Sequence, residues 1–280
     1  MHLDECQDFG CSCLTQLALG RRTEPGGGEI VNSNGIAADI RRGIAAGQYR
    51  YGARLPSVRD LAERYEVSQQ TVAAAYAVLA ALGMVRTERG SGTVVTAGRS
   101  ADAHLGTFTP PDLAAATAWK PSDGGQATEE TTLVRQLAAP KYPADWGLAE
   151  GSQVVERTRI RSVDGIPAQH KMTVLPYEIA ARAPEGYEGA PPMLAPVGAQ
   201  PVKPPTGVRV ADWLGWDVAR TEAFITAEPM DPAASAALGM AEGTPGFRIA
   251  NVTKDSEGNT VYVTVTTAPL HHRVTLDIIG

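Results

Sequence analysis

The stretch "SVRDLAERYEVSQQTVAAAYAVL", residues 57–79, predicts two short helices joined by a tight turn. Ser57 lies three residues before Asp60, which is the capping-box pattern that begins a helix. Ser68 is a suitable N-cap for the second helix, which Gly83 ends. Apolar residues recur at helical spacing in both segments: Leu61, Ala62 and Tyr65, then Val72, Ala75, Tyr76, Leu79 and Leu82. Helices this short depend on packing for their stability, so the stretch predicts a helix-turn-helix unit.

The flanking sequence supplies a third helix and a pair of strands. Upstream, Ile36, Ile40 and Ile44 recur every four residues, and Gly47 ends that run. Downstream, "MVRTE" and "TVVTA" are typical of strands, and "RGSG" between them favours a hairpin turn. Three helices followed by a two-stranded ribbon predict a winged helix-turn-helix domain over residues 35–98.

The rest of the 280 residues is long enough for a second domain. Residues 1–34 lack sustained periodicity and are expected to be a disordered leader, whereas residues 99–130 have the Pro, Gly and Ala content of a linker. From residue 131 to 280, strand-like alternation, an Asp-Gly turn and short helical runs predict an antiparallel sheet with helices. The expected fold class is therefore α+β.

Charge has to be counted by region, because the formal net charge of the whole chain is −6. Residues 35–98 contain eight Arg, no Lys and five acidic residues, and this is the only net-positive segment. Charge therefore permits nucleic-acid binding there without requiring it.

Cysteine usage and hydropathy indicate the cellular compartment that the sequence favours. The three cysteines, Cys6, Cys11 and Cys13, are expected to be unpaired thiols rather than zinc ligands, because structural zinc needs four ligands. No disulfide framework and no apolar run of about 20 residues is present, which predicts a cytoplasmic protein without a membrane partner. No metal site and no cofactor are expected.

A helix-turn-helix places the start of its second helix in the DNA major groove. Glutamine can pair with adenine, and serine or threonine can bond a phosphate. A basic residue beside a glycine at the wing can enter the minor groove. The alternative is that Gln69 and Gln70 are only solvent-exposed residues of the helix surface and that Arg59 forms an ion pair with Asp60 or Glu63. The candidate DNA-binding residues are Arg59, Ser68, Gln69, Gln70, Thr71, Arg89 and Gly90.

Residues 36–95 closely resemble the winged-helix domain of the GntR family of bacterial transcription regulators. The shared motifs are G-x-Y-x-x-G-x-x-LPS-x-R-x-LA, V-S-x-x-T-V and, at the wing, G-x-G-T-x-V. The resemblance implies DNA contacts from Arg59, the start of the second helix, and the wing. One departure matters: Gln69 stands where many members have Arg, which implies a different operator sequence.

Residues 131–280 resemble the UTRA effector domain of the HutC subgroup, whose fold is similar to that of chorismate lyase. The shared features are Arg159, Arg161, Asp164, Gly165, Pro167 and Pro176, followed by "LGMAEGTP" and "KDSEGNTVYV". Arg157, Arg159 and Arg161 alternate along one strand, so that face meets either solvent and acidic neighbours or an anionic or polyhydroxy ligand.

The resemblance implies that Arg159, Arg161 and Lys171 contact a small-molecule effector. Lys171, Glu228 and Asn251 differ from the residues of sugar-sensing members, which leaves open whether the pocket has been repurposed or has degenerated.

These features predict a homodimeric regulator of transcription, a repressor, that binds double-stranded operator DNA and is modulated by a small molecule. The alternative is a constitutive DNA-binding repressor whose second domain only dimerises. An enzyme is not expected, because no nucleophile–base pair or pair of carboxylates is visible in the sequence.

Overall fold

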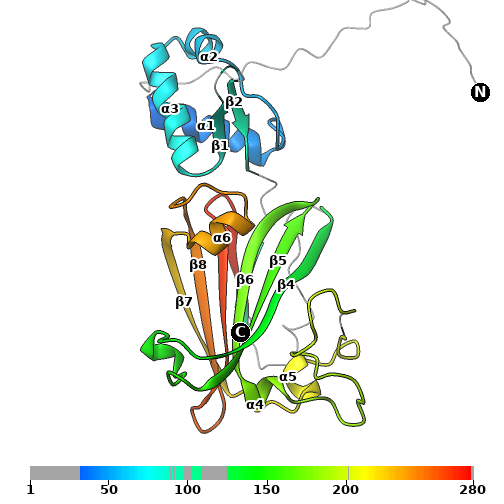
Figure 1. Ribbon diagram of the computed structural model, residues 1–280. Helices are drawn as coiled ribbons and strands as arrows, with labels where there is room; N and C mark the ends of the chain where they lie inside the picture. The colour runs from blue at the N-terminus through cyan, green and yellow to red at the C-terminus, as the bar shows by residue number, and fades with distance from the viewer. Residues whose placement is uncertain are drawn as a thin grey trace, which may run out of the picture. The chain divides into compact units, whose positions relative to one another are not determined.

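The computed structural model describes residues 32–88, 90, 92–97, 102–108, 125–200 and 202–278. The first domain contains three helices followed by a two-stranded antiparallel ribbon (Figure 1), which confirms the winged helix-turn-helix. Its elements are α1 (Ser33–Ala45), α2 (Val58–Tyr65), α3 (Gln69–Ala81), β1 (Val85–Glu88) and β2 (Gly92–Val95).

Helix α1 begins before position 35, within the range expected to be a leader. The Asn32 side chain accepts a hydrogen bond of 2.9 Å from the Gly35 backbone N–H and so caps the helix. This cap extends ordered structure upstream of the isoleucine pattern from which the boundary was inferred.

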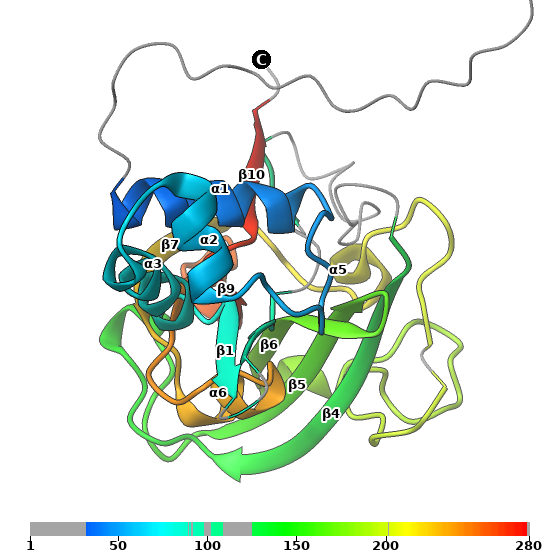
Figure 2. The same cartoon turned by 90° about the horizontal axis from the view of Figure 1, so that it is seen from above.

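The three helices of the first domain lie close together (Figure 2). Their apolar side chains form one buried core. Ile36 is fully buried, and Leu61 of α2 and Leu79 of α3 are each 1% exposed. Burying side chains of this size contributes roughly 1.5–3 kcal/mol each, so their spacing fixes how the helices pack. Tyr76 of α3 also donates a hydrogen bond to the Pro56 carbonyl, which ties α3 to the segment that begins α2.

The second domain is a six-stranded antiparallel sheet with the strand order β4-β5-β6-β9-β8-β7, as expected for an α+β fold. Its strands are β4 (Ala127–Ala138), β5 (Gln153–Val163), β6 (Ile166–Pro176), β7 (Arg220–Pro229), β8 (Pro245–Lys254) and β9 (Thr260–Pro269). A separate parallel pair joins β3 (Asp102–Phe108) to β10 (Arg273–Ile278).

Strand β3 and the first residues of β4 lie within residues 99–130, where a linker was expected. β4 is an edge strand, and its residues 127–130 are exposed. A strand segment with neither face buried has no apolar alternation in its sequence, so the pattern did not reveal where β4 starts.

The turns of the two central hairpins, β5–β6 and β8–β9, have the residue types that their backbone conformations favour. Asp164 and Gly165 have φ values of 51° and 78°, the left-handed conformation that a two-residue hairpin turn requires. At the β8–β9 turn, the Asp255 carboxylate accepts hydrogen bonds from the backbone N–H groups of Glu257 and Asn259. Both turns were expected from the sequence.

Each face of the sheet packs against its own apolar cluster. One face carries Val154, Val174 and Val263 with Trp146 of a short 3-10 helix (Ala144–Trp146). The other face carries Val155 and Leu175, covered by residues 177–219. This covering segment contains α4 (Tyr177–Ala180) and α5 (Val210–Trp213), while α6 (Pro232–Ala237) follows β7 (Figure 1).

Candidate nucleic-acid interface and ligand pocket

The first turn of α3 is fixed by its own cap. The Ser68 Oγ accepts a hydrogen bond of 3.1 Å from the Thr71 backbone N–H, and the two hydroxyls lie 2.8 Å apart. Gln69 and Gln70 follow directly and are exposed. Their amides make no side-chain hydrogen bond within the described part of the chain. The turn therefore presents two polar side chains on a rigid backbone.

Arg59 lies on α2 and is held only weakly. Its Nε is 3.1 Å from Glu63 Oε1, and the two side chains are 77% and 69% exposed. The ion pair considered as the alternative role of Arg59 is therefore present. An exposed pair at this spacing contributes a few tenths of a kcal/mol, so a phosphate can displace the carboxylate.

At the wing, Gly90 has a φ of 80°, in the left-handed region that favours glycine. Arg89 lies outside the described residues. β1 and β2 pair in register up to Glu88 and Gly92, which closes the ribbon around this turn. The hairpin predicted around "RGSG" is confirmed.

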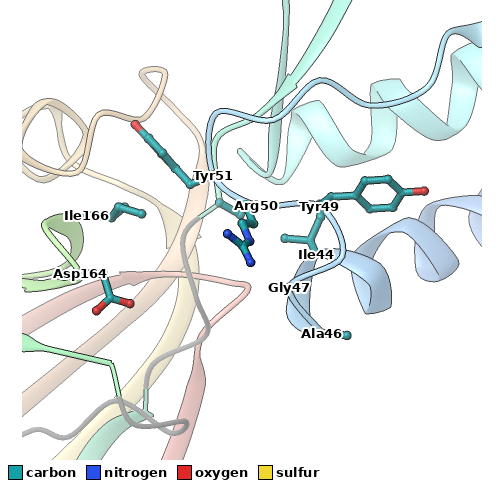
Figure 3. A pocket seen from close by; sticks show the side chains of 9 residues that line it. Ile44, Ala46, Gly47, Tyr49, Arg50, Tyr51, Asp164 and Ile166 are labelled. Atoms are coloured by element: carbon teal, nitrogen blue, oxygen red, sulfur yellow. The ribbon is translucent and has the colours of Figure 1, made fainter.

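Sequence reasoning missed one exposed cation and one exposed aromatic ring. Arg50 and Tyr51 lie on the turn after α1, and Tyr51 is 55% exposed (Figure 3). Neighbouring Tyr49 points away from them and packs against the core of the first domain. A basic residue beside an aromatic one in a Gly-rich turn is the signal that could have identified them.

The second domain contains a cavity of about 260 Å³ between the β5–β6–β9 face of the sheet and the covering segment. Arg159 and Lys171 line it and are direct cross-strand neighbours on β5 and β6. The full lining is Arg159, Lys171, Thr173, Leu175, Met193, Arg209, Val210, Ala211, Trp216, Val218, Tyr262 and Thr264. Two of the three residues predicted to bind an effector are thus brought together at one cavity.

Arg161 is the third predicted residue, and it is not among those that line the cavity. Glu129 of β4 accepts hydrogen bonds from both arginines: 2.9 Å from Arg159 Nη1 and 2.6 Å from Arg161 Nε. Arg161 also reaches Gln169 Oε1 at 3.4 Å. Burial raises the pKa of Glu129, but Arg161 and Arg159 outweigh this effect and hold that pKa below its usual value.

Arg157 binds backbone carbonyls, whereas Arg159 and Arg161 bind the Glu129 carboxylate. Arg157 is 7% exposed and donates hydrogen bonds to the backbone carbonyls of Pro192, at 2.9 Å, and Met193. Burial lowers its pKa to about 10. Since Met193 lines the cavity, Arg157 holds the covering segment over the sheet.

Ten of the twelve lining residues were not predicted from the sequence, among them Arg209, Trp216 and Tyr262. Arg209 is the N-cap residue of α5, and its Nε lies 2.6 Å from Asp212 Oδ2. The Trp216 ring is held by a 3.2 Å hydrogen bond from its Nε1 to the Ile179 carbonyl, and its centroid lies 5.6 Å from that of Tyr262. Arg209 and Trp216 come from the segment that covers the sheet and Tyr262 comes from β9, so no local pattern joins them.

Lys171 is the least compensated cation of the cavity. Its ammonium makes no hydrogen bond or ion pair with any residue that the structure describes. Burial and then the neighbouring Arg161 and Arg159 lower its pKa to about 8, so it is still charged at neutral pH. In the part of the chain that the structure describes, one carboxylate, that of Glu129, faces Arg159, Arg161 and Lys171, which leaves a surplus of positive charge there.

The two other residues that distinguish this chain from sugar-sensing members lie outside the cavity lining. Glu228 of β7 pairs with Arg248, whose Nε is 3.4 Å from Glu228 Oε1. Asn251 of β8 is the cross-strand neighbour of Thr264, and its buried Oδ1 has no hydrogen-bond partner among the described residues.

The described residues lack two further kinds of feature. They contain no group of three or more His, Cys, Asp or Glu side chains placed to hold a metal ion. Within the same ranges, no helix has both the length and the apolar character needed to span a membrane. The three cysteines lie outside the described residues.

The family model for bacterial regulatory proteins of the gntR family matches residues 32–95. A 52-residue stretch is 48% identical to an uncharacterized HTH-type transcriptional regulator of Streptomyces coelicolor, covering 19% of this chain and 19% of that protein. This chain therefore aligns with about a fifth of that relative.

Solved structures are similar over more of the chain but at low identity. PhnF from Mycobacterium smegmatis is 23% identical with a TM-score of 0.46, over 88% of this chain and 98% of that one. YydK from Bacillus subtilis is 16% identical with a TM-score of 0.42, over 90% and 100%. At these values neither structure identifies the function of the second domain, whereas residues 32–95 carry a winged helix-turn-helix of the gntR type.

Proposed function

We propose that this chain is a DNA-binding regulator of transcription that reads double-stranded operator DNA through α2, α3 and the wing. The observation that carries the proposal is the match of residues 32–95 to the gntR family model, in a domain whose α3 begins with two exposed, uncommitted glutamines. Helix α3 enters the major groove with its first turn foremost.

Each predicted residue then has a defined role. The Ser68 cap holds the first turn of α3, and Gln69 or Gln70 forms a bidentate pair with an adenine. Arg59 exchanges Glu63 for a phosphate or a base edge. Gly90 lets the wing turn approach the backbone closely, and we assign Arg89 to the minor groove.

The second domain is proposed to be a UTRA-type effector domain of the HutC subgroup. It joins two copies of the chain, so that two winged helices meet half-sites about one helical turn apart on a two-fold operator. The cavity beside Arg159 and Lys171 takes a small molecule. That molecule binds more tightly to the protein conformation that has low DNA affinity than to the one that has high DNA affinity. It therefore releases the repressor from DNA.

Sequencing the genomic fragments that the purified protein retains tests the DNA-binding role. One enriched motif with two-fold symmetry and half-sites one turn apart is expected. Retention without an enriched motif would contradict sequence-specific regulation. A constitutive repressor would bind the same motif, but no small molecule would change its affinity.

A further inference from the structure

We infer that the effector of the second domain is a small carboxylate with an apolar body, rather than a sugar phosphate. This inference rests on the proposed function, since it names the ligand class of the cavity assigned there. Three features carry it: the uncompensated cations on the sheet, the apolar walls and the small volume.

The charged end of the cavity is built to hold one anionic group. Lys171 and Arg159 are cross-strand neighbours and both line the cavity, so one carboxylate can bridge them. Glu129 already neutralises one arginine charge of the Arg159 and Arg161 pair. Lys171 is half-buried as a residue. Its ammonium has no partner among the described residues and is left to a ligand. A desolvated cation favours an anion over a neutral group.

Arg209 extends the positive character to the covering side of the cavity. It lies at the N-cap of α5 and is oriented by Asp212, so its guanidinium is already fixed before a ligand arrives. The pair with Asp212 is close to neutral, which makes Arg209 a hydrogen-bond donor to the ligand rather than a further surplus charge.

The remaining wall is apolar. Its residues share hydrocarbon or aromatic surfaces: Leu175, Met193, Val210, Ala211, Trp216, Val218 and Tyr262. The side chains with hydroxyl groups in this lining are those of Thr173, Thr264 and Tyr262. The hydroxyls of a sugar would lose water against this wall without gaining enough partners, whereas a hydrocarbon or aryl group gains by burial.

The volume limits the ligand further. A cavity of about 260 Å³ lies just below the usual range of about 300–1,000 Å³ for ligand pockets. An aryl or short alkyl carboxylate fits this space. The Trp216 ring, fixed through Ile179, offers a flat surface for stacking on such a body.

Calorimetric titration of the full chain with phenylacetate, benzoate and hexanoate tests the inference, with phenylacetamide as the neutral isostere and glucose 6-phosphate as the polyol phosphate. We expect at least one carboxylate to bind tenfold or more tightly than phenylacetamide and than glucose 6-phosphate. Equal binding of the amide, tighter binding of glucose 6-phosphate, or no binding of any of the three carboxylates at millimolar concentration would overturn it.

Variants locate the binding. Lys171→Met should weaken carboxylate binding at least tenfold, and Lys171→Arg should restore most of it because the charge returns. Lys141→Met, a change at an exposed lysine outside the cavity, is the matched control and should leave binding unchanged. Carboxylate binding that survives Lys171→Met would place the ligand elsewhere and contradict the assignment.

The same titrations with promoter DNA present separate the two proposals. If a carboxylate binds but DNA affinity stays constant, the ligand class holds and effector control fails. If DNA is released by a sugar phosphate instead, effector control holds and the ligand class fails.

Discussion

Glu129 of β4 lies opposite Arg161 of β5, with its Oε2 2.6 Å from the Arg161 Nε, and the same carboxylate accepts a hydrogen bond from Arg159. One carboxylate thus serves two guanidinium groups at the rim of the cavity. It makes a row of arginines on one strand tolerable, and it engages Arg161, which does not line the cavity.

Replacing Glu129 with Gln should lower stability and strengthen anion binding. The variant leaves two arginines without their shared carboxylate, which costs about 1 kcal/mol at this half-exposed site. It also removes a negative charge beside Arg159, so the positive charge at the cavity is less neutralised. Urea unfolding measures the first effect and phenylacetate titration the second. Glu222→Gln on β7, which removes an exposed partner of Arg220, should change neither by a comparable amount.

The stability loss in Glu129→Gln should depend on pH. Because the pKa of Glu129 is lower in the folded state, its contribution is present above the unfolded pKa and is lost as pH falls through the acid range. The gap between wild type and Glu129→Gln should be full at pH 7 and shrink toward pH 3. A constant gap would contradict the charged interaction.

Carboxylate affinity should fall as pH rises above 8. The pKa of Lys171 is about 8, and the groups that face it are Glu129, Arg159 and Arg161, with Arg209 on the covering side. Above pH 8 the Lys171 ammonium of the ligand-free protein loses its proton. Carboxylate binding must then be accompanied by proton uptake at Lys171, which weakens the measured affinity. Titrations should show affinity about tenfold weaker at pH 9.5 than at pH 7.5. Lys171→Met should remove this dependence.

Replacing Tyr76 with Phe should destabilise the first domain by about 1 kcal/mol, because the Pro56 carbonyl loses its donor. Burial raises the pKa of Tyr76, which keeps this donor protonated. Thermal unfolding of the full chain measures the loss. Tyr51→Phe removes the hydroxyl of an exposed tyrosine and is the control. Equal melting curves for the two variants would show that the hydrogen bond does not stabilise the domain.

Local signals predicted a helix start in the first domain and a hairpin turn in the second. Ser57 and Asp60 form the capping box that their spacing indicated, and Asp164 and Gly165 form the turn that their residue types require. Both features involve neighbours in sequence, where backbone chemistry decides the outcome.

The cavity could be predicted only in part, because its contacts span the chain. Arg159 and Lys171 were named, yet the capture of Arg161 by Glu129 joins residues 32 positions apart. Arg209 and Trp216 reach the cavity through an irregular segment that has no periodicity to read. The contacts of Arg157 could not be predicted either, because its partners are backbone carbonyls, which every residue has.

DNA affinity should fall steeply with salt. Phosphate contacts release counterions, with a slope of about −0.9 in log affinity against log salt for each contact. Fluorescence anisotropy of a labelled promoter fragment between low and moderate salt measures this slope, and a flat dependence would contradict binding through phosphates.

Anisotropy with variants of the proposed reading surface tests the central claim most directly. Wild type, Arg59→Ala, Gln69→Ala and the matched control Arg220→Ala, which removes an exposed arginine of the second domain, are titrated with the same promoter fragment at constant salt. We predict that Arg59→Ala and Gln69→Ala each weaken binding by about 1–3 kcal/mol while Arg220→Ala does not. Unchanged affinity in both of the first two variants would contradict the account that α2 and the start of α3 read DNA.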